Sequence, residues 1–372
     1  MSLRSPLHRY EEIAEEIRVS LNRGAFGPDG RLPSERWFGK TYSAQRNTVR
    51  QALGLLEREG KIESVGKSGW FVTKAETRRG KETLAGQRVM LVTFRRPSGS
   101  TIDHLTQGLR EVLNEKGIEL LRYDSQAHEE AQHIETIEQL TTVDAGAIVM
   151  WPHNSVDKSL LARLQASTPL ILVDRRVFGF ESDSVLFDDL KAGQTITEHL
   201  IANGHRRIAF LGDEPFAESV QNRWRGYRQA LEGAGIVPDE NLTTLVYGRH
   251  EPAFSRHIRI LLQEKPTAIV CSNDGVASCV LLILREDKIR TPEDIAVTGF
   301  GNDASGYLDV IGLTTMSQPF GQIGREAGRL LLERLTEPPI NRAPANREVW
   351  IPMDLVVRAS SSPNAKTRRS AE

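Results

Sequence analysis

From Arg88 onward the chain alternates apolar runs of strand length with helical segments, and this alternation restricts the possible folds more than any other feature. A strand that helices cover on both faces is a short, continuous apolar run, as the segment 89–94 is. The expected strands are 89–94, 119–123, 147–151, 170–174, 184–187, 208–211, 244–246, 268–271, 296–300 and 348–357. The expected helices are 102–116, 129–140, 158–165, 190–202, 223–234, 254–262, 276–285 and 321–335. About 270 residues exceed one ordinary core, so the pattern predicts an α/β fold with parallel sheets in two lobes.

The segment 31–72 has a different pattern, which predicts a winged helix-turn-helix. Ser34 can cap a helix that ends near Tyr42, because its hydroxyl can accept a hydrogen bond from a first-turn backbone N–H. The next helix, 46–59, ends at Gly60, and a first helix with its own apolar stripe precedes both. The buried stripe of helix 46–59 consists of Val49, Ala52, Leu53 and Leu56. Short strands at 62–65 and 70–72 enclose the glycine-rich segment 66–69.

The chemistry of the exposed residues in this segment fits DNA. Arg46, Asn47 and Arg50 lie off the apolar stripe, near the end of the helix that a helix-turn-helix inserts into the major groove. Arginine offers two donors to guanine, and asparagine pairs with adenine. The hairpin tip carries Lys67 between glycines, so it can approach a phosphate or a minor groove closely.

Composition and charge support this division of the chain. Residues 1–79 carry 15 Lys+Arg and 10 Asp+Glu, net +5, whereas the remainder carries 33 against 39, net −6. A basic N-terminal segment suits phosphate neutralisation. Cys271 and Cys279 are the two cysteines and do not suggest a disulfide framework. No N-terminal apolar leader and no run of 18 apolar residues is present, so we expect a cytoplasmic protein.

The segment 32–72 resembles the GntR family of bacterial transcription regulators. The matching pieces are LPSER at 32–36, RNTVRQAL at 46–53, LEREGKI at 56–62 and GKSGWFV at 66–72. Chemistry and resemblance together make the candidate DNA contacts Arg36, Arg46, Asn47, Thr48, Arg50, Gly66, Lys67, Ser68 and Gly69. Gln45 departs from the family, which usually opens this helix with Ser or Thr, so the helix cap and its phosphate contact are in question.

The segment 88–358 resembles the effector domain of LacI-type repressors, which share the fold of periplasmic sugar-binding proteins. The matching pieces are LVDRR at 172–176, GHRRIAFLG at 204–212, RGYRQALEGAGI at 225–236, PTAIVCSND at 266–274, PEDIAVTGF at 292–300 and LTTMSQPF at 313–320. Joined to the GntR-type segment, this architecture resembles the arabinose-responsive repressors. The resemblance implies a ligand between the lobes, at the carboxyl ends of the strands.

Six residues are candidate effector contacts. By resemblance, Asp174, Arg223 at the start of a helix, and Asn273 face the ligand, and their chemistry suits a polyol. The aromatic candidates for a sugar's C–H face are Trp151, Phe187 and Phe320. The structural alternatives are an Asp174–Arg175 ion pair, a surface position for Arg223 and aromatic side chains that are simply core.

Two departures from the LacI-type pattern leave the identity of the effector open. Gly301 stands where many relatives carry an Asp, so one hydroxyl contact is missing unless Asn302 substitutes for it. Thr101 and Ile102 replace a commonly aromatic pair in the first-lobe loop. Gly299-x-Gly301-x-x-Ala304 imitates a dinucleotide fingerprint without its helix or its acidic ribose partner.

The expected organisation is a DNA-binding domain at 1–73, a linker at 74–87, a two-lobed effector-binding and dimerisation domain at 88–359 and a disordered tail at 360–372. The expected function is that of a homodimeric regulator, a repressor that a small molecule, most readily a monosaccharide, releases from double-stranded operator DNA. We expect no catalytic residue, cofactor or metal. Three alternatives stay open: a solute-binding module with no direct promoter role, an α/β sugar- or nucleoside-processing enzyme with a DNA-binding appendage, and an activator or a nucleobase-responsive regulator.

Overall fold

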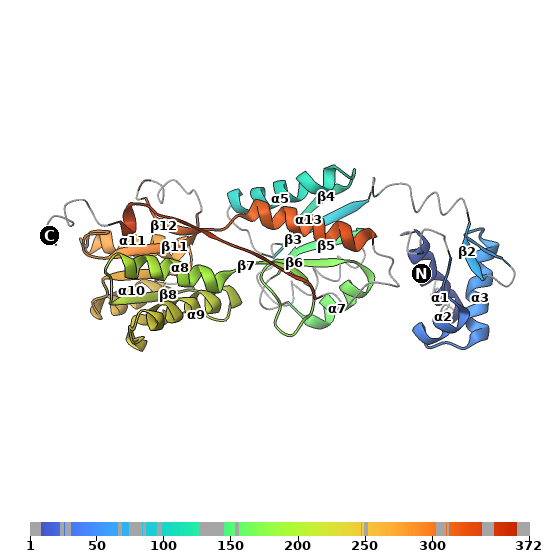
Figure 1. The fold of residues 1–372 in the computed structure, drawn as a ribbon, viewed down its shortest axis with the longest axis horizontal. Coiled ribbons are helices and arrows are strands. Elements are labelled where there is room, and N and C mark those ends of the chain that lie inside the picture. Colours follow the sequence, from blue (N-terminus) through green and yellow to red (C-terminus); the bar gives the residue numbers. More distant parts are fainter. Residues whose placement is uncertain are drawn as a thin grey trace.

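The computed structural model describes residues 9–22, 26, 31–65, 69–73, 84, 87–94, 99–125, 145–152, 156–246, 248, 252–302, 310, 312–336 and 346–362. Figure 1 shows a small N-terminal domain followed by two α/β lobes. The expected helix 129–140 lies outside the described residues. Among the helices that are described, none is long and apolar enough to cross a membrane.

The N-terminal domain is a three-helix unit with a two-stranded wing. Its helices are α1 (Arg9–Asn22), α2 (Glu35–Thr41) and α3 (Arg46–Arg58), and its strands are β1 (Ile62–Ser64) and β2 (Trp70–Val72). Ser34 caps α2 as predicted, because its hydroxyl accepts a hydrogen bond from the backbone N–H of Trp37. The apolar faces of the three helices close one core, which includes Ile13 and Ile17 of α1.

The first lobe is a six-stranded sheet with helices on both faces. The sheet order is β13-β7-β6-β5-β3-β4, and every described pair is parallel. Its strands are β3 (Arg88–Thr93), β4 (Glu119–Asp124), β5 (Ala147–Trp151), β6 (Leu170–Asp174), β7 (Asp183–Phe187) and β13 (Glu348–Ile351). Helices α5 (Gly99–Asn114) and α13 (Phe320–Thr336) cover one face, and α7 (Lys158–Ser167) packs on the other.

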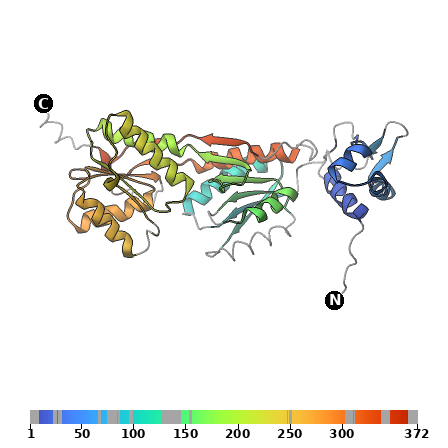
Figure 2. The same ribbon diagram turned by 90° about the horizontal axis from the view of Figure 1, so that it is seen from below.

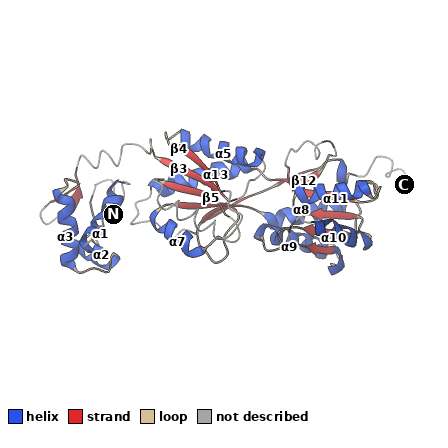
Figure 3. Ribbon diagram, turned by 180° about the vertical axis from the view of Figure 1, so that it is seen from behind, coloured by secondary structure: helices blue, strands red, loops and turns tan. Residues whose placement is uncertain are grey.

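The second lobe repeats this plan (Figure 2). Its sheet order is β14-β12-β11-β10-β8-β9. Its strands are β8 (Ile208–Gly212), β9 (Thr243–Leu245), β10 (Ala268–Cys271), β11 (Ala296–Gly301), β12 (Thr314–Ser317) and β14 (Asp354–Val356). Helices α8 (Asp189–Ala202) and α9 (Glu218–Gly233) cover one face, and α10 (Pro252–Gln263) and α11 (Asp274–Glu286) cover the other (Figure 3).

Four expectations about these elements need correction. The region 348–357 is two strands in different sheets, and β14 pairs antiparallel with β12, so the second sheet is mixed. Helix α9 begins at Glu218, so Arg223 lies in its second turn and does not open it. The tail does not begin at residue 360, because Ser360 and Ser361 are buried in the short helix η4 (Ala359–Ser361).

The chain crosses between the lobes at three places: after β7, after β12 and after β13. At each crossing it leaves the carboxyl end of a parallel strand and enters the other lobe. The carboxyl edges of the two sheets therefore face one another across the gap between the lobes. Open α/β sheets bind their ligands at such edges.

The carboxyl-terminal segment is fixed to the second lobe by a chain of hydroxyl groups. His199 Nε2 lies 2.8 Å from Ser361 Oγ, and Ser361 Oγ donates to Thr314 Oγ1 at 2.6 Å. Burial lowers the pKa of His199, so the neutral imidazole is the form that fits this site.

This geometry predicts a loss of stability at mildly acidic pH. Because the pKa of His199 is lower in the folded state than in the unfolded chain, unfolding takes up protons below about pH 6.5. The free energy of unfolding should therefore fall as pH falls through this value, until the folded-state pKa is passed. Urea titrations of the wild type and of His199→Gln at pH 7.5 and 5.5 measure this, and the variant should lose less stability than the wild type. An equal loss in both would show that His199 does not contribute.

Candidate functional site

Helix α3 places the predicted basic residues at one exposed end of the N-terminal domain. Arg46, Asn47 and Arg50 are exposed, whereas Thr48 is half-buried. Arg36 is exposed on the neighbouring helix α2, and Gly69, directly before β2, has a φ of 103°. Gly66, Lys67 and Ser68 lie outside the described residues. Gln45 precedes α3 without a side-chain cap, as its departure from the family indicated.

One acidic residue that the sequence reasoning missed holds two of these arginines. The Glu35 carboxylate accepts from Arg46 Nε at 2.7 Å and from Arg50 Nε at 3.0 Å. Burial opposes ionisation of Glu35, but the two guanidinium groups prevail and lower its pKa. Because both contacts use Nε, the terminal nitrogens that form the guanidinium fork stay available to a base edge.

Replacing Glu35 with glutamine is expected to weaken discrimination between specific and random DNA. The amide no longer holds the two guanidinium groups by charge, and the loss of a negative charge favours phosphates of any sequence. The dissociation constant for random DNA divided by that for specific DNA should fall about two- to tenfold in a fluorescence-anisotropy assay. Glu59→Gln is the matched control, because Glu59 pairs with Arg18 at 2.7 Å. Equal ratios for both variants would contradict the role of Glu35.

At the carboxyl edge of the second lobe, polar residues form one hydrogen-bonded cluster. Asn273 caps α11 and donates through Nδ2 to Asp213 Oδ1 at 2.6 Å. Ser272 Oγ donates to the same oxygen at 3.2 Å. Asp213 follows β8 directly and is 3% exposed. A carboxylate directly after a buried strand was the sequence signal that could have identified it.

Arg223 belongs to the same cluster and is buried, so a surface position is excluded for it. Its Nε donates to Asp189 Oδ1 at 2.7 Å, and its Nη1 donates to the carbonyl of Ser272 at 2.7 Å. The guanidinium carbon lies 4.7 Å from the ring centroid of Phe300. Burial raises the pKa of Asp189 to about 7, against the opposing charge of Arg223. The pair fixes the start of α8 to α9.

On the first lobe, Asp174 ends β6 and has a φ of 69°. Its carboxylate is buried, and Arg175 Nε donates to Oδ2 at 3.3 Å, so the ion pair considered as an alternative is present. The backbone of Asp174 nevertheless lies at the carboxyl edge that faces the second lobe.

The three aromatic candidates form one cluster. Trp151 lies over Phe320 with ring centroids 5.0 Å apart, and Phe187 meets Phe320 edge-on at 5.0 Å. Phe187 is 1% exposed and belongs to the core, so it supports Phe320 and does not itself present a surface to a ligand. Phe320 lines a cavity of about 370 Å³.

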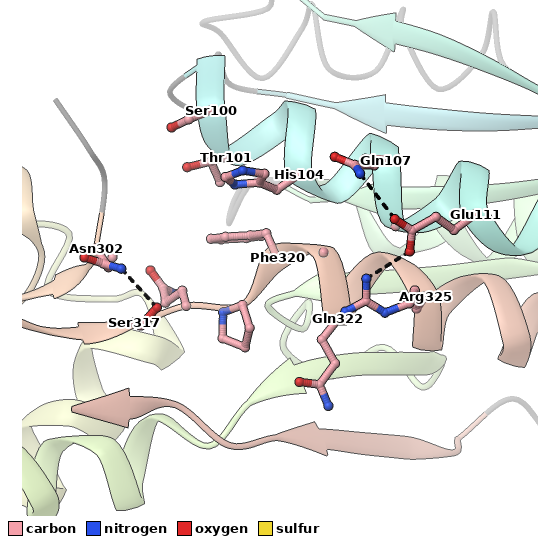
Figure 4. Close-up of a pocket in the computed structure, with 15 residues that line it drawn as sticks. Ser100, Thr101, His104, Gln107, Glu111, Asn302, Ser317, Phe320, Gln322 and Arg325 are labelled. Carbon is pink, nitrogen blue, oxygen red and sulfur yellow. Dashed lines mark hydrogen bonds and ion pairs between the residues drawn. The ribbon is translucent and has the colours of Figure 1, made fainter. Parts of the chain in front are cut away.

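This cavity lies where α5, α13 and the ends of β11 and β12 meet (Figure 4). Asn302 and Ser317 line it from the second lobe, and Thr101 and His104 line it from the first. Of the six candidate effector residues, only Phe320 is among the residues that line it. The sequence pointed to this part of the cavity through the departures from the LacI-type pattern at residues 101, 301 and 302.

Asn302 is held in a fixed orientation at the wall of the cavity. Arg358 Nη2 donates to its Oδ1 at 2.6 Å, and its own Nδ2 donates to Ser317 Oγ at 3.3 Å. Its φ of 57° lies in the left-handed region that asparagine tolerates. Arg358 thus fixes the amide so that Nδ2, a donor, lies on the Ser317 side.

Among the described residues, no cluster of His, Cys, Asp and Glu could hold a metal ion. Cys271 is buried and Cys279 is partly buried, and neither belongs to a disulfide. Burial raises the pKa of Cys271, so its thiol stays protonated.

Comparisons with known proteins agree with both parts of the chain. Residues 9–72 match the family model described as bacterial regulatory proteins of the gntR family, and residues 197–361 match the periplasmic binding protein-like domain. The chain joins a GntR-type helix-turn-helix domain to a LacI-type, periplasmic-binding-protein-like domain. It is therefore a DNA-binding transcriptional regulator.

Similar proteins share this arrangement over nearly their whole length. An arabinose metabolism transcriptional repressor of Geobacillus stearothermophilus is 27% identical over 367 residues, which cover 95% of this chain and 98% of the relative. A repressor of the same description from Halalkalibacterium halodurans is 24% identical and covers 95% of this chain and 96% of the relative. The structure of the regulator CelR with cellobiose superposes with a TM-score of 0.64 at 23% identity, over 88% of this chain and all of that one. This structural likeness confirms the two-lobed fold.

Proposed function

We propose that the protein is a repressor that leaves its operator when a sugar binds between the lobes of its C-terminal domain. The observation that carries the proposal is one chain in which exposed arginines on a recognition helix are joined to a polar cluster at the edge of the second lobe that faces the first. The two relatives that match along nearly their full lengths are arabinose metabolism repressors, so L-arabinose is the first effector to test.

The chemistry of the cluster suits a neutral polyol. Asp213 and Asn273 can exchange hydrogen bonds with adjacent hydroxyls, because a carboxylate accepts and an amide both accepts and donates. The hydrogen bonds of Arg223 to Asp189 and Ser272 use Nε and Nη1, so its Nη2 is the nitrogen that we assign to the effector. We assign Asp174, at the carboxyl edge of the first lobe, to the same ligand, and Phe320 with Trp151 to an apolar surface for a sugar's C–H groups.

Effector binding would favour one relative orientation of the lobes, and the change would reach DNA through a dimer. Dimeric helix-turn-helix proteins bind two half-sites about one DNA turn apart. A small rotation between the two N-terminal domains of a dimer therefore prevents both from contacting their half-sites at once. A coupling of about 1 to 3 kcal/mol lowers operator affinity several-fold to about a hundredfold. We therefore assign the protein a homodimeric state, to be measured by sedimentation equilibrium. Binding to chromosomal operators implies that it acts in the bacterial cytoplasm.

The test begins with selection of an operator from random duplexes by the full-length protein. Fluorescence anisotropy then measures the affinity for that duplex with and without L-arabinose, D-ribose, D-glucose, cellobiose and purine bases. The proposal expects one sugar to weaken binding at least several-fold, and NMR to recover that sugar unchanged, since the domain senses and does not convert it. No selected duplex, or an affinity that no sugar alters, would refute the proposal, and chemical conversion of the sugar would favour an enzyme.

A further inference from the structure

Two consecutive arginines of the first lobe contact acidic residues of the second lobe. Arg175 and Arg176 follow β6, whereas Glu214 follows β8 and Glu218 begins α9. Arg175 Nη1 lies 3.5 Å from Glu214 Oε2, and Arg176 Nε donates to Glu218 Oε2 at 3.0 Å. Arg176 Nη2 donates to the other oxygen of Glu218, so this contact is bidentate, the geometry in which arginine binds carboxylates most strongly.

Each arginine is also held on its own lobe. Arg175 Nε donates to Asp174, and Arg176 Nη1 donates to Glu348 Oε1 at 2.6 Å. The guanidinium of Arg176 also lies over the ring of Trp350, with 5.7 Å from its carbon to the ring centroid. Because these contacts stay within the first lobe, separation of the lobes breaks the bonds to Glu214 and Glu218 and leaves the others in place.

Partial burial strengthens the electrostatic attraction in these interlobe contacts. The side chains of Arg175 and Glu214 are 15% and 18% exposed, so solvent and salt screen this pair less than a surface pair. Arg176 and Glu218 are each 37% exposed, and the hydrogen bonds that Arg176 donates to Glu218 raise the pKa of Arg176. Glu214 itself has a φ of 54°, in the left-handed region.

We propose that Arg175 and Arg176, with Glu214 and Glu218, form an interlobe clasp that sets the free energy required to separate the two lobes. The clasp adjoins the candidate effector residues at two points. Arg175 contacts Asp174 through Nε and Glu214 through Nη1. Glu218 is the first residue of α9, the helix that carries Arg223. A ligand hydroxyl that donates to Asp174 would release Arg175 toward Glu214 and so favour closure; this last step rests on the proposed function.

The experiment measures the distance between the lobes in the full-length protein without any effector. Fluorophores attached to p-acetylphenylalanine at positions 163 and 256, which are exposed on α7 and α10, report the lobe separation by energy transfer. Arg176→Gln should raise the ratio of open to closed molecules about two- to fivefold, as expected for a partly exposed pair. The matched control is Arg207→Gln, because Arg207 contacts two carboxylates, Asp239 and Glu264, within the second lobe alone.

A double-mutant cycle separates the clasp from a general loss of stability. If Arg176 and Glu218 act on each other, then Glu218→Gln and the double variant should each open the lobes about as much as Arg176→Gln does. Raising NaCl from about 0.1 to about 1 M, which shortens the screening length from about 10 to about 3 Å, should open the wild type more than the double variant. Effects that multiply in the double variant, or equal distributions for Arg176→Gln and Arg207→Gln, would overturn the clasp. Because no sugar or DNA is present, this result is independent of the test of the proposed function.

Discussion

Replacing Arg46 with alanine is expected to lower the affinity for the selected operator about 5- to 150-fold and to relax the preference at one base pair. Arg46 is exposed at the N-terminal end of α3, and Glu35 holds it through Nε alone. A bidentate contact between arginine and guanine contributes about 1 to 3 kcal/mol, which corresponds to this range. Fluorescence anisotropy with the operator and with each single-base variant of it measures both effects.

Arg58→Ala provides the control for this prediction. Arg58 lies at the opposite end of the same helix, and its Nε donates to the carbonyl of Gly54 at 3.2 Å. It carries the same charge, so its removal should reduce affinity modestly for all sequences alike and should lower the salt dependence. Equal and sequence-independent losses for Arg46→Ala and Arg58→Ala would show that α3 does not read bases with its N-terminal end.

Gly226→Ala is expected to destabilise the second lobe by about 3 kcal/mol, at the upper end of the usual cost of overpacking. A Cβ atom at this position would lie 2.1 Å from the carbonyl oxygen of Leu190 and 2.6 Å from the backbone nitrogen of Gln194. These are backbone atoms of α8, so no side-chain rotation relieves the overlap and the two helices must separate. Thermal and urea denaturation of the full-length protein measure the loss.

Gly233→Ala is the matched control, because Gly233 ends the same helix and has no atom within 4 Å of an added Cβ. It should leave the melting temperature unchanged or raise it, since alanine favours a helix more than glycine does. The first lobe offers a second comparison: Gly324→Ala would place a Cβ 2.3 Å from the carbonyl oxygen of Leu105 on α5 and should be similarly costly. A Gly226→Ala variant as stable as Gly233→Ala would mean that α8 and α9 can move apart freely.

The sequence by itself determined the local elements, because their causes are local. The Ser34 cap follows from a hydrogen bond within one helical turn. The apolar stripe of α3 and the exposed arginines at its start follow from helical periodicity. The continuous apolar runs likewise indicated buried strands with helices on both faces, and the length of this region, about 270 residues, indicated two lobes. The start of α9 was misplaced by five residues because no capping side chain marks it.

Only the tertiary structure decided what each polar residue contacts. Glu35 is 11 positions from Arg46, Arg176 is 42 from Glu218, and Asp189 is 34 from Arg223, so no spacing rule connects these partners. It also decided that β13 and β14 belong to different sheets and that Ser361 is buried against His199. The physical reason is that burial and ion pairing depend on which surfaces meet after folding, whereas helices and strands are already encoded by short-range pattern.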